Sequence, residues 1–134
     1  MDKKKIVLIT GGARGIGFGT IEYLLEQRNY EIISASRGEK NIALAKEKLR
    51  DNVNRVTFLQ GDISSEKDCK KIYEEINNKY SRLDGLVNSA GIIKLGGIEE
   101  QTLEEWNNLI NINLTGIFLL TKTLLPLLKK GTNP

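Results

Sequence analysis

The stretch from Thr10 to Gly17, with the sequence TGGARGIG, constrains the fold of this chain more than any other. An apolar run at residues 6–9 precedes it, and a helical apolar pattern follows it at Ile16, Ile21, Leu24 and Leu25. A buried strand therefore turns into a helix at a cluster of glycines. Glycine permits positive φ and a close approach to the backbone, and a helix N-terminus presents free N–H groups to an anion. The pattern predicts a phosphate-binding turn, against the alternative of a glycine-rich turn without a ligand.

The glycines of this turn are Gly11, Gly15 and Gly17, a spacing that differs from the Gly-x-Gly-x-x-Gly of the commonest dinucleotide fingerprint. We expect Gly15 to tolerate no side chain, because a Cβ there would clash within the turn. A Gly15→Val substitution is therefore predicted to abolish dinucleotide binding.

The rest of the chain alternates strand and helix patterns without internal repeats. Strands are predicted at residues 5–10, 31–36, 55–60 and 83–88, and helices at residues 15–28 and 41–50. A third helix begins at Ser64 or Ser65, where Ser65 and Asp68 resemble a capping box; a last helix begins at the capping box of Thr102 and Glu105. The alternation predicts one α/β domain over residues 1–134, a Rossmann-like, doubly wound parallel sheet with strand order 3-2-1-4.

Composition excludes several classes of protein. The chain has 134 residues, 40% hydrophobic content and a net charge of +3, values typical of a soluble domain. Its basic run, residues 3–5, begins a strand, so we expect no nucleic-acid partner. It contains no histidine and one cysteine, Cys69, which we expect to be buried. We therefore expect no disulfide and no metal site.

The most apolar late stretch, residues 109–128, is predicted to be a buried amphipathic helix and not a membrane span. Polar residues and a proline interrupt it, namely Asn111, Asn113, Thr115, Lys122 and Pro126. Its predicted apolar positions, with those of the turns before it, are Trp106, Leu109, Ile110, Leu114, Ile117, Phe118 and Leu125. The N-terminus lacks the long apolar segment of a signal peptide, so a cytoplasmic location without membrane contact is expected.

Residues suited to a ligand follow the carboxyl end of every predicted strand. After the glycine turn come Ser36-Arg37, then Gly61-Asp62-Ile63, then the segment from Asn88 to Gly91. The carboxyl ends of parallel strands meet at one edge of a sheet, so these segments are predicted to border one crevice.

The charges at the second strand favour NADP(H) over NAD(H) as the cofactor. An NAD site commonly has an acidic residue there for the ribose 2′-hydroxyl. This chain has Ser36 followed by Arg37, and Arg14 lies in the glycine turn. Two guanidinium groups can bind a 2′-phosphate through charge-assisted hydrogen bonds. The alternatives are that both arginines are solvated surface residues, and that NAD(H) also binds.

These motifs together resemble the short-chain dehydrogenase/reductase family, of the small single-domain type. The resemblance spans essentially the whole chain and rests on the following residues: Thr10, Gly11, Gly15, Ile16 and Gly17; Asp62; Asn88-Ser89-Ala90-Gly91; and Asn111-Ile112-Asn113-Leu114-Thr115-Gly116. Ser89 departs from the second asparagine usual in the family, and only a minor effect is expected.

The resemblance implies a role for each matching residue. Gly11, Gly15, Ile16 and Gly17 would form the pyrophosphate turn. Asp62 would accept a hydrogen bond from the adenine amino group, with the Ile63 backbone beside it. Asn88, Ala90 and Gly91 would border the cofactor. Asn113 would be the active-site asparagine that helps to hold a water for proton relay.

The family also uses a serine after a fifth strand and a Tyr-x-x-x-Lys helix, and neither motif occurs in this sequence. Its tyrosines are Tyr23, Tyr30, Tyr73 and Tyr80, and the residues four positions later are Gln27, Ser34, Asn77 and Asp84. The chain therefore resembles the N-terminal, cofactor-binding part of the family, truncated relative to the complete fold. We expect residues 1–134 alone to be inactive.

The resemblance implies hydride transfer between a nicotinamide and a small-molecule alcohol or carbonyl compound, in a homo-oligomer. The unpaired edge of the strand at residues 83–88 is expected to promote self-association. Two alternatives remain. One is a non-catalytic nucleotide-binding module with a regulatory or assembly role. The other, a sugar-nucleotide epimerase or dehydratase of the extended type, is less favoured because Asn88–Gly91 resembles the small-reductase loop.

Overall fold

A computed structural model describes residues 3–132, and its elements alternate in the predicted order. The strands are β1 (Lys5–Thr10), β2 (Tyr30–Ser36), β3 (Val56–Gln60) and β4 (Gly85–Asn88). The helices are α1 (Gly15–Gln27), α2 (Glu39–Leu49), α3 (Glu66–Tyr80), α4 (Leu103–Ile110) and α5 (Gly116–Leu128). A 3-10 segment, η1 (Arg50–Arg55), precedes β3, and a π-helical turn, η2 (Asn111–Thr115), joins α4 to α5.

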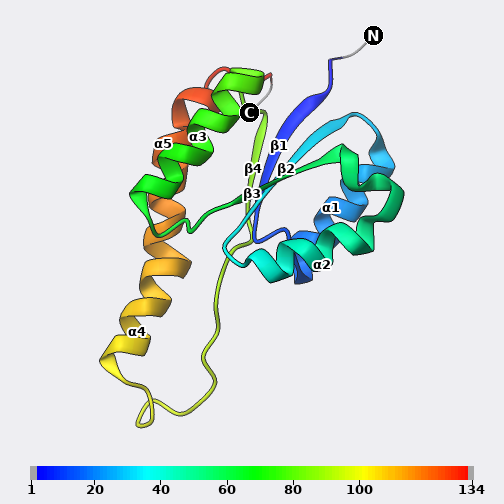
Figure 1. Cartoon of the computed structure of the whole chain (residues 1–134). Helices are drawn as coiled ribbons and strands as arrows, with labels where there is room; N and C mark the ends of the chain where they lie inside the picture. The colour runs from blue at the N-terminus through cyan, green and yellow to red at the C-terminus, as the bar shows by residue number, and fades with distance from the viewer. Residues whose placement is uncertain (1–2, 133–134) are drawn as a thin grey trace.

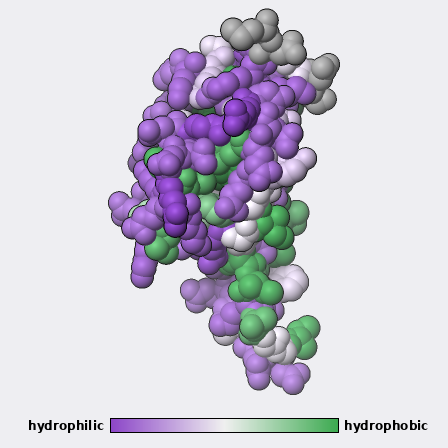
Figure 2. Space-filling model, turned by 90° about the vertical axis from the view of Figure 1, so that its right-hand side faces the viewer, coloured by the Kyte–Doolittle hydropathy of each residue, from purple (hydrophilic) through white to green (hydrophobic). Residues whose placement is uncertain are grey.

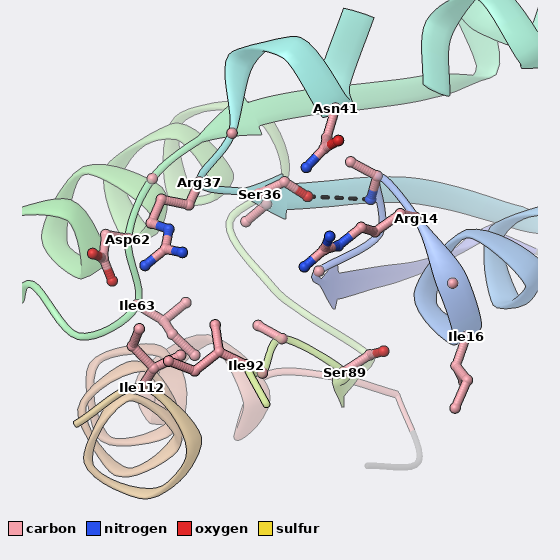
Figure 3. Close-up of a pocket in the computed structure, with 18 residues that line it drawn as sticks. Arg14, Ile16, Ser36, Arg37, Asn41, Asp62, Ile63, Ser89, Ile92 and Ile112 are labelled. Atoms are coloured by element: carbon pink, nitrogen blue, oxygen red, sulfur yellow. Dashed lines mark hydrogen bonds between the residues drawn. The ribbon is translucent and has the colours of Figure 1, made fainter. Parts of the chain in front are cut away.

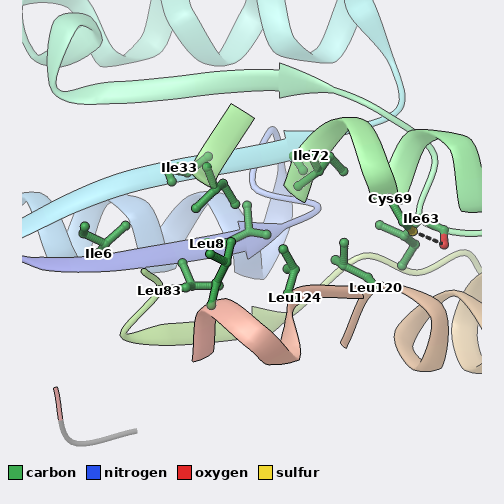
Figure 4. Packing of buried hydrophobic residues seen from close by; sticks show 12 residues of the cluster. Ile6, Leu8, Ile33, Ile63, Cys69, Ile72, Leu83, Leu120 and Leu124 are labelled. Carbon is green, nitrogen blue, oxygen red and sulfur yellow. Dashed lines mark hydrogen bonds between the residues drawn. The ribbon is translucent and has the colours of Figure 1, made fainter. Parts of the chain in front are cut away.

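The strands form one parallel sheet in the order β3-β2-β1-β4, which confirms the predicted α/β topology. Helices α1 and α2 cover one face of the sheet, and α3 and α5 cover the other (Figure 1). Each face has its own core. Ile9, Ile21 and Ile32 are buried on the first, and Leu8, Ile72 and Leu124 on the second (Figure 4).

Of the two capping boxes predicted at the starts of α3 and α4, only the one at α4 forms. At α4, Thr102 and Glu105 form the predicted capping box, each side chain accepting a backbone N–H of the other residue at 3.1 Å. At α3, the Ser65 hydroxyl accepts the Asp68 N–H at 3.2 Å, but the Asp68 carboxylate accepts the Asp62 N–H at 2.8 Å instead of completing the box. The shorter side chain of Asp68 is thus used to fix the bend after β3.

The predicted apolar face of the last helix is wrong. Most of those residues are exposed, with Trp106 at 54%, Leu114 at 64% and Phe118 at 60%. The buried positions are Ile112, Gly116, Leu120, Leu124 and Leu127. The segment is apolar on more than one side, so periodicity alone does not identify the side that packs on the sheet. Gly116 decides it, since a Cβ there would lie 2.8 Å from Ile63 Cγ1, an approach that only glycine permits.

The helical segment from Leu103 to Leu128 has 26 residues and is apolar enough to span a membrane by length and composition alone. Its α5 part, however, packs on the sheet with Leu120, Leu124 and Leu127 fully buried inside the protein. Ile16, another residue of a predicted apolar pattern, is 86% exposed because it stands at the mouth of a cavity.

A buried carboxylate, that of Asp84, connects segments at the amino-terminal ends of the strands through hydrogen bonds. Asp84 accepts the backbone N–H groups of Ile6 and Thr132, each at 2.7 Å, and its Oδ2 lies 3.2 Å from Arg82 Nε. Arg82 in turn donates to the Lys4 carbonyl at 2.8 Å. Burial alone would raise the pKa of the Asp84 carboxyl. The hydrogen bonds from Ile6 and Thr132 and the charge of Arg82 outweigh burial and lower that pKa.

Candidate cofactor-binding site

A cavity of about 310 Å³ opens at the carboxyl ends of the strands (Figure 3). Its lining includes most of the predicted cofactor-binding residues: Gly11, Arg14, Gly15, Ile16, Ser36, Arg37, Asp62, Ile63, Ala90 and Gly91. The predicted residues Gly17 and Asn88 do not line it. The four strand-end segments thus meet at one edge, as the parallel topology requires.

The glycine turn brings β1 close to the loop after β4. Gly11 has φ +65°, and a Cβ there would lie 2.8 Å from Ala90 Cα. Gly15 has φ +57°, but no atom lies within 4 Å of a Cβ built on it. The expected clash at Gly15 is therefore wrong, because its missing side chain would point into open space. The glycine that packs against the backbone of the turn is Gly17, since a Cβ there would overlap the Gly11 carbonyl oxygen.

The start of α1 offers hydrogen-bond donors to an anion. The first helical bond runs from the Phe18 N–H to the Arg14 carbonyl at 3.2 Å. Among residues 3–132, no side chain caps this end, and the first turn contains no acidic residue. The N–H groups of Gly15, Ile16 and Gly17 are thus left for a ligand at the cavity. Backbone donors, a partial positive charge and small residues suit a pyrophosphate.

The end of β2 is tied to this turn by a buried hydroxyl. Ser36 is 8% exposed, and its Oγ accepts the Ala13 N–H at 3.2 Å (Figure 3). The Gly11 N–H donates to the Ala35 carbonyl at 2.8 Å. Ser36 therefore fixes the shape of the turn, a role that the sequence did not indicate.

Arg14 and Arg37 are exposed, and both side chains point toward the middle of the cavity (Figure 3). Neither forms an ion pair within the described part of the chain. Asn41, in the first turn of α2, points toward the same space. It was not predicted, because a polar residue in a first helical turn carries no specific signal. Ala13, Gly61 and Ser89, which belong to the predicted turn and strand-end segments, also line the cavity, as does Ile92. Ala35, Gly38 and Ile112 line it as well and were not predicted.

Asp62 is held by its neighbours after β3. Its Oδ1 accepts the Ser64 N–H at 2.9 Å and the Ser64 hydroxyl at 2.6 Å. Within residues 3–132, its Oδ2 accepts no hydrogen bond from the protein. One carboxylate oxygen is thus engaged, and the other remains for a donor at the cavity, which the side chain lines.

Thr10 connects the end of β1 to the loop after β4. It is fully buried, and its Oγ1 accepts the Ser89 N–H at 3.1 Å and the Ala90 N–H at 3.0 Å. The loop is held farther along by Asn113 in η2, whose amide accepts the Ile92 N–H and donates to the Ile92 carbonyl, both at 2.8 Å. Asn113 does not line the cavity, but Ile92 and Ile112 do. Its predicted role in holding a water stays a prediction.

Cys69 is buried, as predicted, and its Sγ lies 3.2 Å from the Ile63 carbonyl. Burial, helped by the nearby carboxylates, raises the pKa of this thiol to about 11. The thiol is therefore protonated at neutral pH and serves as a small core residue.

The sheet order and the cavity at the carboxyl edge define a doubly wound α/β protein, in which ligands commonly bind at the reversal of strand order, here between β1 and β4. The model of the short chain dehydrogenase family matches residues 5–133, and the chain belongs to this family.

Relatives and solved structures agree with this assignment. The chain is 34% identical over 118 residues to the 3-oxoacyl-(acyl-carrier-protein) reductase FabG of Aquifex aeolicus, covering 88% of this chain and 48% of that protein. It is 32% identical over 129 residues to 11-beta-hydroxysteroid dehydrogenase A of Sesamum indicum, covering 95% and 37%. The structure of NADPH-bound carbonyl reductase from chicken fatty liver matches with a TM-score of 0.83 and 26% identity, covering 97% and 50%. The chain thus spans about half the length of most relatives it matches.

Proposed function

We propose that this chain is the NAD(P)-binding part of an oxidoreductase that interconverts a small-molecule alcohol and a carbonyl compound in the cytoplasm. The observation that carries the proposal is the uncapped start of α1, which opens on the cavity beside glycines with positive φ. Gly15, Ile16 and Gly17 would donate N–H groups to the pyrophosphate. Asp62 would accept from the adenine amino group through its unengaged oxygen.

A bound nicotinamide supplies or accepts the hydride. The residues of this chain would shape the cavity around the nicotinamide. Thr10 and Asn113 hold the loop from Ser89 to Ile92, which forms one wall of the cavity. Residues 92–97, farther along this loop, would border the substrate side. Asn113 is proposed to hold a water there for proton relay.

We also propose that NADP(H) is preferred and that NAD(H) binds more weakly. No acidic side chain follows β2 at the cavity, and two arginines point into it. The chicken carbonyl reductase that resembles this chain was solved with NADPH. We expect Arg37→Ala to weaken NADPH binding by about tenfold or more, because charge-assisted hydrogen bonds to the 2′-phosphate contribute about 1.5–3 kcal/mol. Isothermal titration with NADPH and NADH measures the effect.

The control is Lys40→Ala, which removes an exposed cation of α2, three residues after Arg37, that does not line the cavity. It should leave the ratio of the two affinities unchanged. An unchanged ratio in Arg37→Ala would contradict the proposed NADP preference, whereas loss of binding for both cofactors would point to damage of the whole site.

Residues 1–134 alone are expected to bind cofactor without turnover. They contain no tyrosine followed by a lysine four positions later, so no such pair supplies the proton that accompanies hydride transfer. General acid–base help of this kind contributes about 10²–10⁴-fold in rate. The measurement is NADPH oxidation with a panel of carbonyl compounds, beside a direct binding titration. Turnover above background would contradict the expectation. Binding without turnover would also suit the alternative, a non-catalytic nucleotide-binding module.

We further propose a homo-oligomer. Within residues 3–132, β4 pairs with β1 only, so one edge of β4 is open to another strand.

A further inference from the structure

A second cavity, of about 230 Å³, lies between β3 and the C-terminal part of α3, the helix that covers this face of the sheet (Figure 1). It is here called the β3–α3 cavity, and its lining residues are Ile33, Thr57, Leu59, Glu75, Ile76, Asn78, Lys79 and Tyr80. None of these residues lines the cofactor cavity. The β3–α3 cavity is therefore a separate space, which the proposed function does not use.

The inner wall of the β3–α3 cavity is apolar. Thr57 pairs with Ile33 in the sheet, and Leu59 lies two residues farther along β3, so the three side chains share one face. Ile76 of α3 packs on this face, and both Ile33 and Ile76 are 1% exposed. Thr57 has a short side chain, so it leaves room between the strand and the helix that a larger residue would fill.

Tyr80 brings a hydroxyl group to this wall. It is the last residue of α3 and packs against the core of the same face. Its hydroxyl oxygen is buried, and within residues 3–132 it has no hydrogen-bond partner. Buried hydroxyl groups in folded proteins are normally paired, because leaving one unpaired is unfavourable. A molecule that fills the cavity should therefore carry a hydrogen-bonding group.

Two opposite charges lie at the mouth of the β3–α3 cavity. Glu75 and Lys79 are exposed lining residues, and neither forms an ion pair in the part of the chain that the structure describes. Lys79 Nζ lies 3.4 Å from Thr57 Oγ1 and 5.1 Å from the centroid of the Tyr80 ring. Since a carboxylate and an ammonium group flank the same opening, neither an anion nor a cation is favoured there.

The volume of the β3–α3 cavity suits a single ring. An apolar cavity of about 150 Å³ in another protein binds benzene, whereas pockets for drug-sized ligands measure about 300–1,000 Å³. A space of about 230 Å³ falls between these limits. It can therefore hold one ring with a small substituent.

The most exposed hydrophobic side chains of the chain lie in another region. Ile93, Leu95 and Ile98 of the loop after β4 are exposed, and hydrophobic side chains gather in this lower part of the molecule (Figure 2). A small molecule gains most from walls that remove it from water. The buried Ile33 and Ile76 of the β3–α3 cavity meet this condition, whereas exposed side chains do not.

We propose that the β3–α3 cavity binds an uncharged aromatic alcohol with a single ring, the chemical class of the phenols. The ring lies against Ile33, Leu59 and Ile76, and its hydroxyl group pairs with that of Tyr80. This site goes beyond the proposed function and does not rest on it, because the two cavities share no residue.

The first test is a titration of the isotope-labelled chain with phenol, followed by two-dimensional NMR. We expect saturable shifts of the Thr57, Leu59 and Ile76 amide signals, with an affinity in the millimolar range because the ligand is small. Benzoate, a charged ring of similar size, should bind more weakly than phenol. Shifts confined to the cofactor cavity, no saturable shift at all, or tighter binding of benzoate would overturn the proposal.

The second test removes only the hydroxyl group, by Tyr80→Phe. Toluene, in which a methyl group replaces the hydroxyl of phenol, is the comparison ligand. The ratio of phenol affinity to toluene affinity should fall about fivefold in Tyr80→Phe, because one buried hydrogen bond is lost. The matched control is Tyr73→Phe, on a tyrosine of α3 that packs against the same core but does not line the cavity. An unchanged ratio in Tyr80→Phe would overturn the assigned pairing.

The third test fills the space from the strand. Thr57→Phe should abolish the saturable shifts, whereas Thr57→Val, which keeps the size of the side chain, should retain them. Thr57 is only partly buried, and both new residues suit a strand, so folding should be preserved, which the spectra of the free variants check. Phenol binding by a folded Thr57→Phe variant would overturn the location. If that variant does not fold, the ratio measured with Tyr80→Phe decides.

Discussion

Replacing Asp84 by alanine is expected to lower the free energy of unfolding by about 3–5 kcal/mol, the range found when one partner of a buried ion pair is removed. The side chain of Asp84 is 1% exposed, and that of Arg82 is 11% exposed. Without the carboxylate, the Ile6 N–H loses its side-chain acceptor, the Arg82 guanidinium loses its counter-charge, and Thr132 loses its hydrogen bonds to Asp84. Urea unfolding at neutral pH measures the loss.

The same carboxylate predicts a dependence of stability on pH. Its pKa is lowered in the folded state, so its contribution is complete above the ordinary aspartate pKa of about 3.9. The contribution is lost as the pH falls below that value, through the folded-state pKa. The difference in stability between wild type and Asp84→Ala should therefore shrink in acid. Asp51→Ala, at an exposed aspartate of η1, serves as the control. A difference that stays constant down to low pH would contradict the assigned role.

Gly17→Val is expected to destabilise the fold by about 1–3 kcal/mol or more and to abolish cofactor binding. A Cβ at this position overlaps the Gly11 carbonyl oxygen and lies 3.0 Å from Gly12 Cα, so the backbone of the turn must shift. The shift would displace the N–H groups at the start of α1. Thermal melting and NADPH titration measure the two effects separately.

Gly19→Val is the matched control, because it lies two residues farther along α1 and no atom lies within 4 Å of a Cβ built there. It should fold and bind NADPH like the wild type. If Gly17→Val bound normally, the close contact between α1 and the turn would not be needed for the site.

The sequence predicted most of the fold because its signals are local and agree with each other. The glycine turn between a buried strand and a helix, and the capping box of Thr102 and Glu105, each set one boundary. Strand order followed from the connection rules for parallel strands. The 3-10 segment η1 and the π-helical turn η2 were not predicted, since neither has a distinctive residue pattern.

The errors concern packing between distant segments. The side of α5 that faces the sheet depends on Gly116 meeting Ile63, a contact between residues far apart in the sequence. The tight glycine proved to be Gly17 rather than Gly15 for the same reason, because only the folded turn shows which missing Cβ faces backbone. The cavity was predicted through its strand-end residues, whereas Asn41 belongs to it only because α2 begins at its rim.

Asp84 and its partners lie at the amino-terminal ends of the strands, and the cavity lies at the opposite ends. Substitutions that alter ligand preference at the cavity therefore leave the hydrogen bonds and the ion pair of Asp84 unchanged. A lineage with this architecture can change its ligand over evolutionary time without a matching loss of thermodynamic stability.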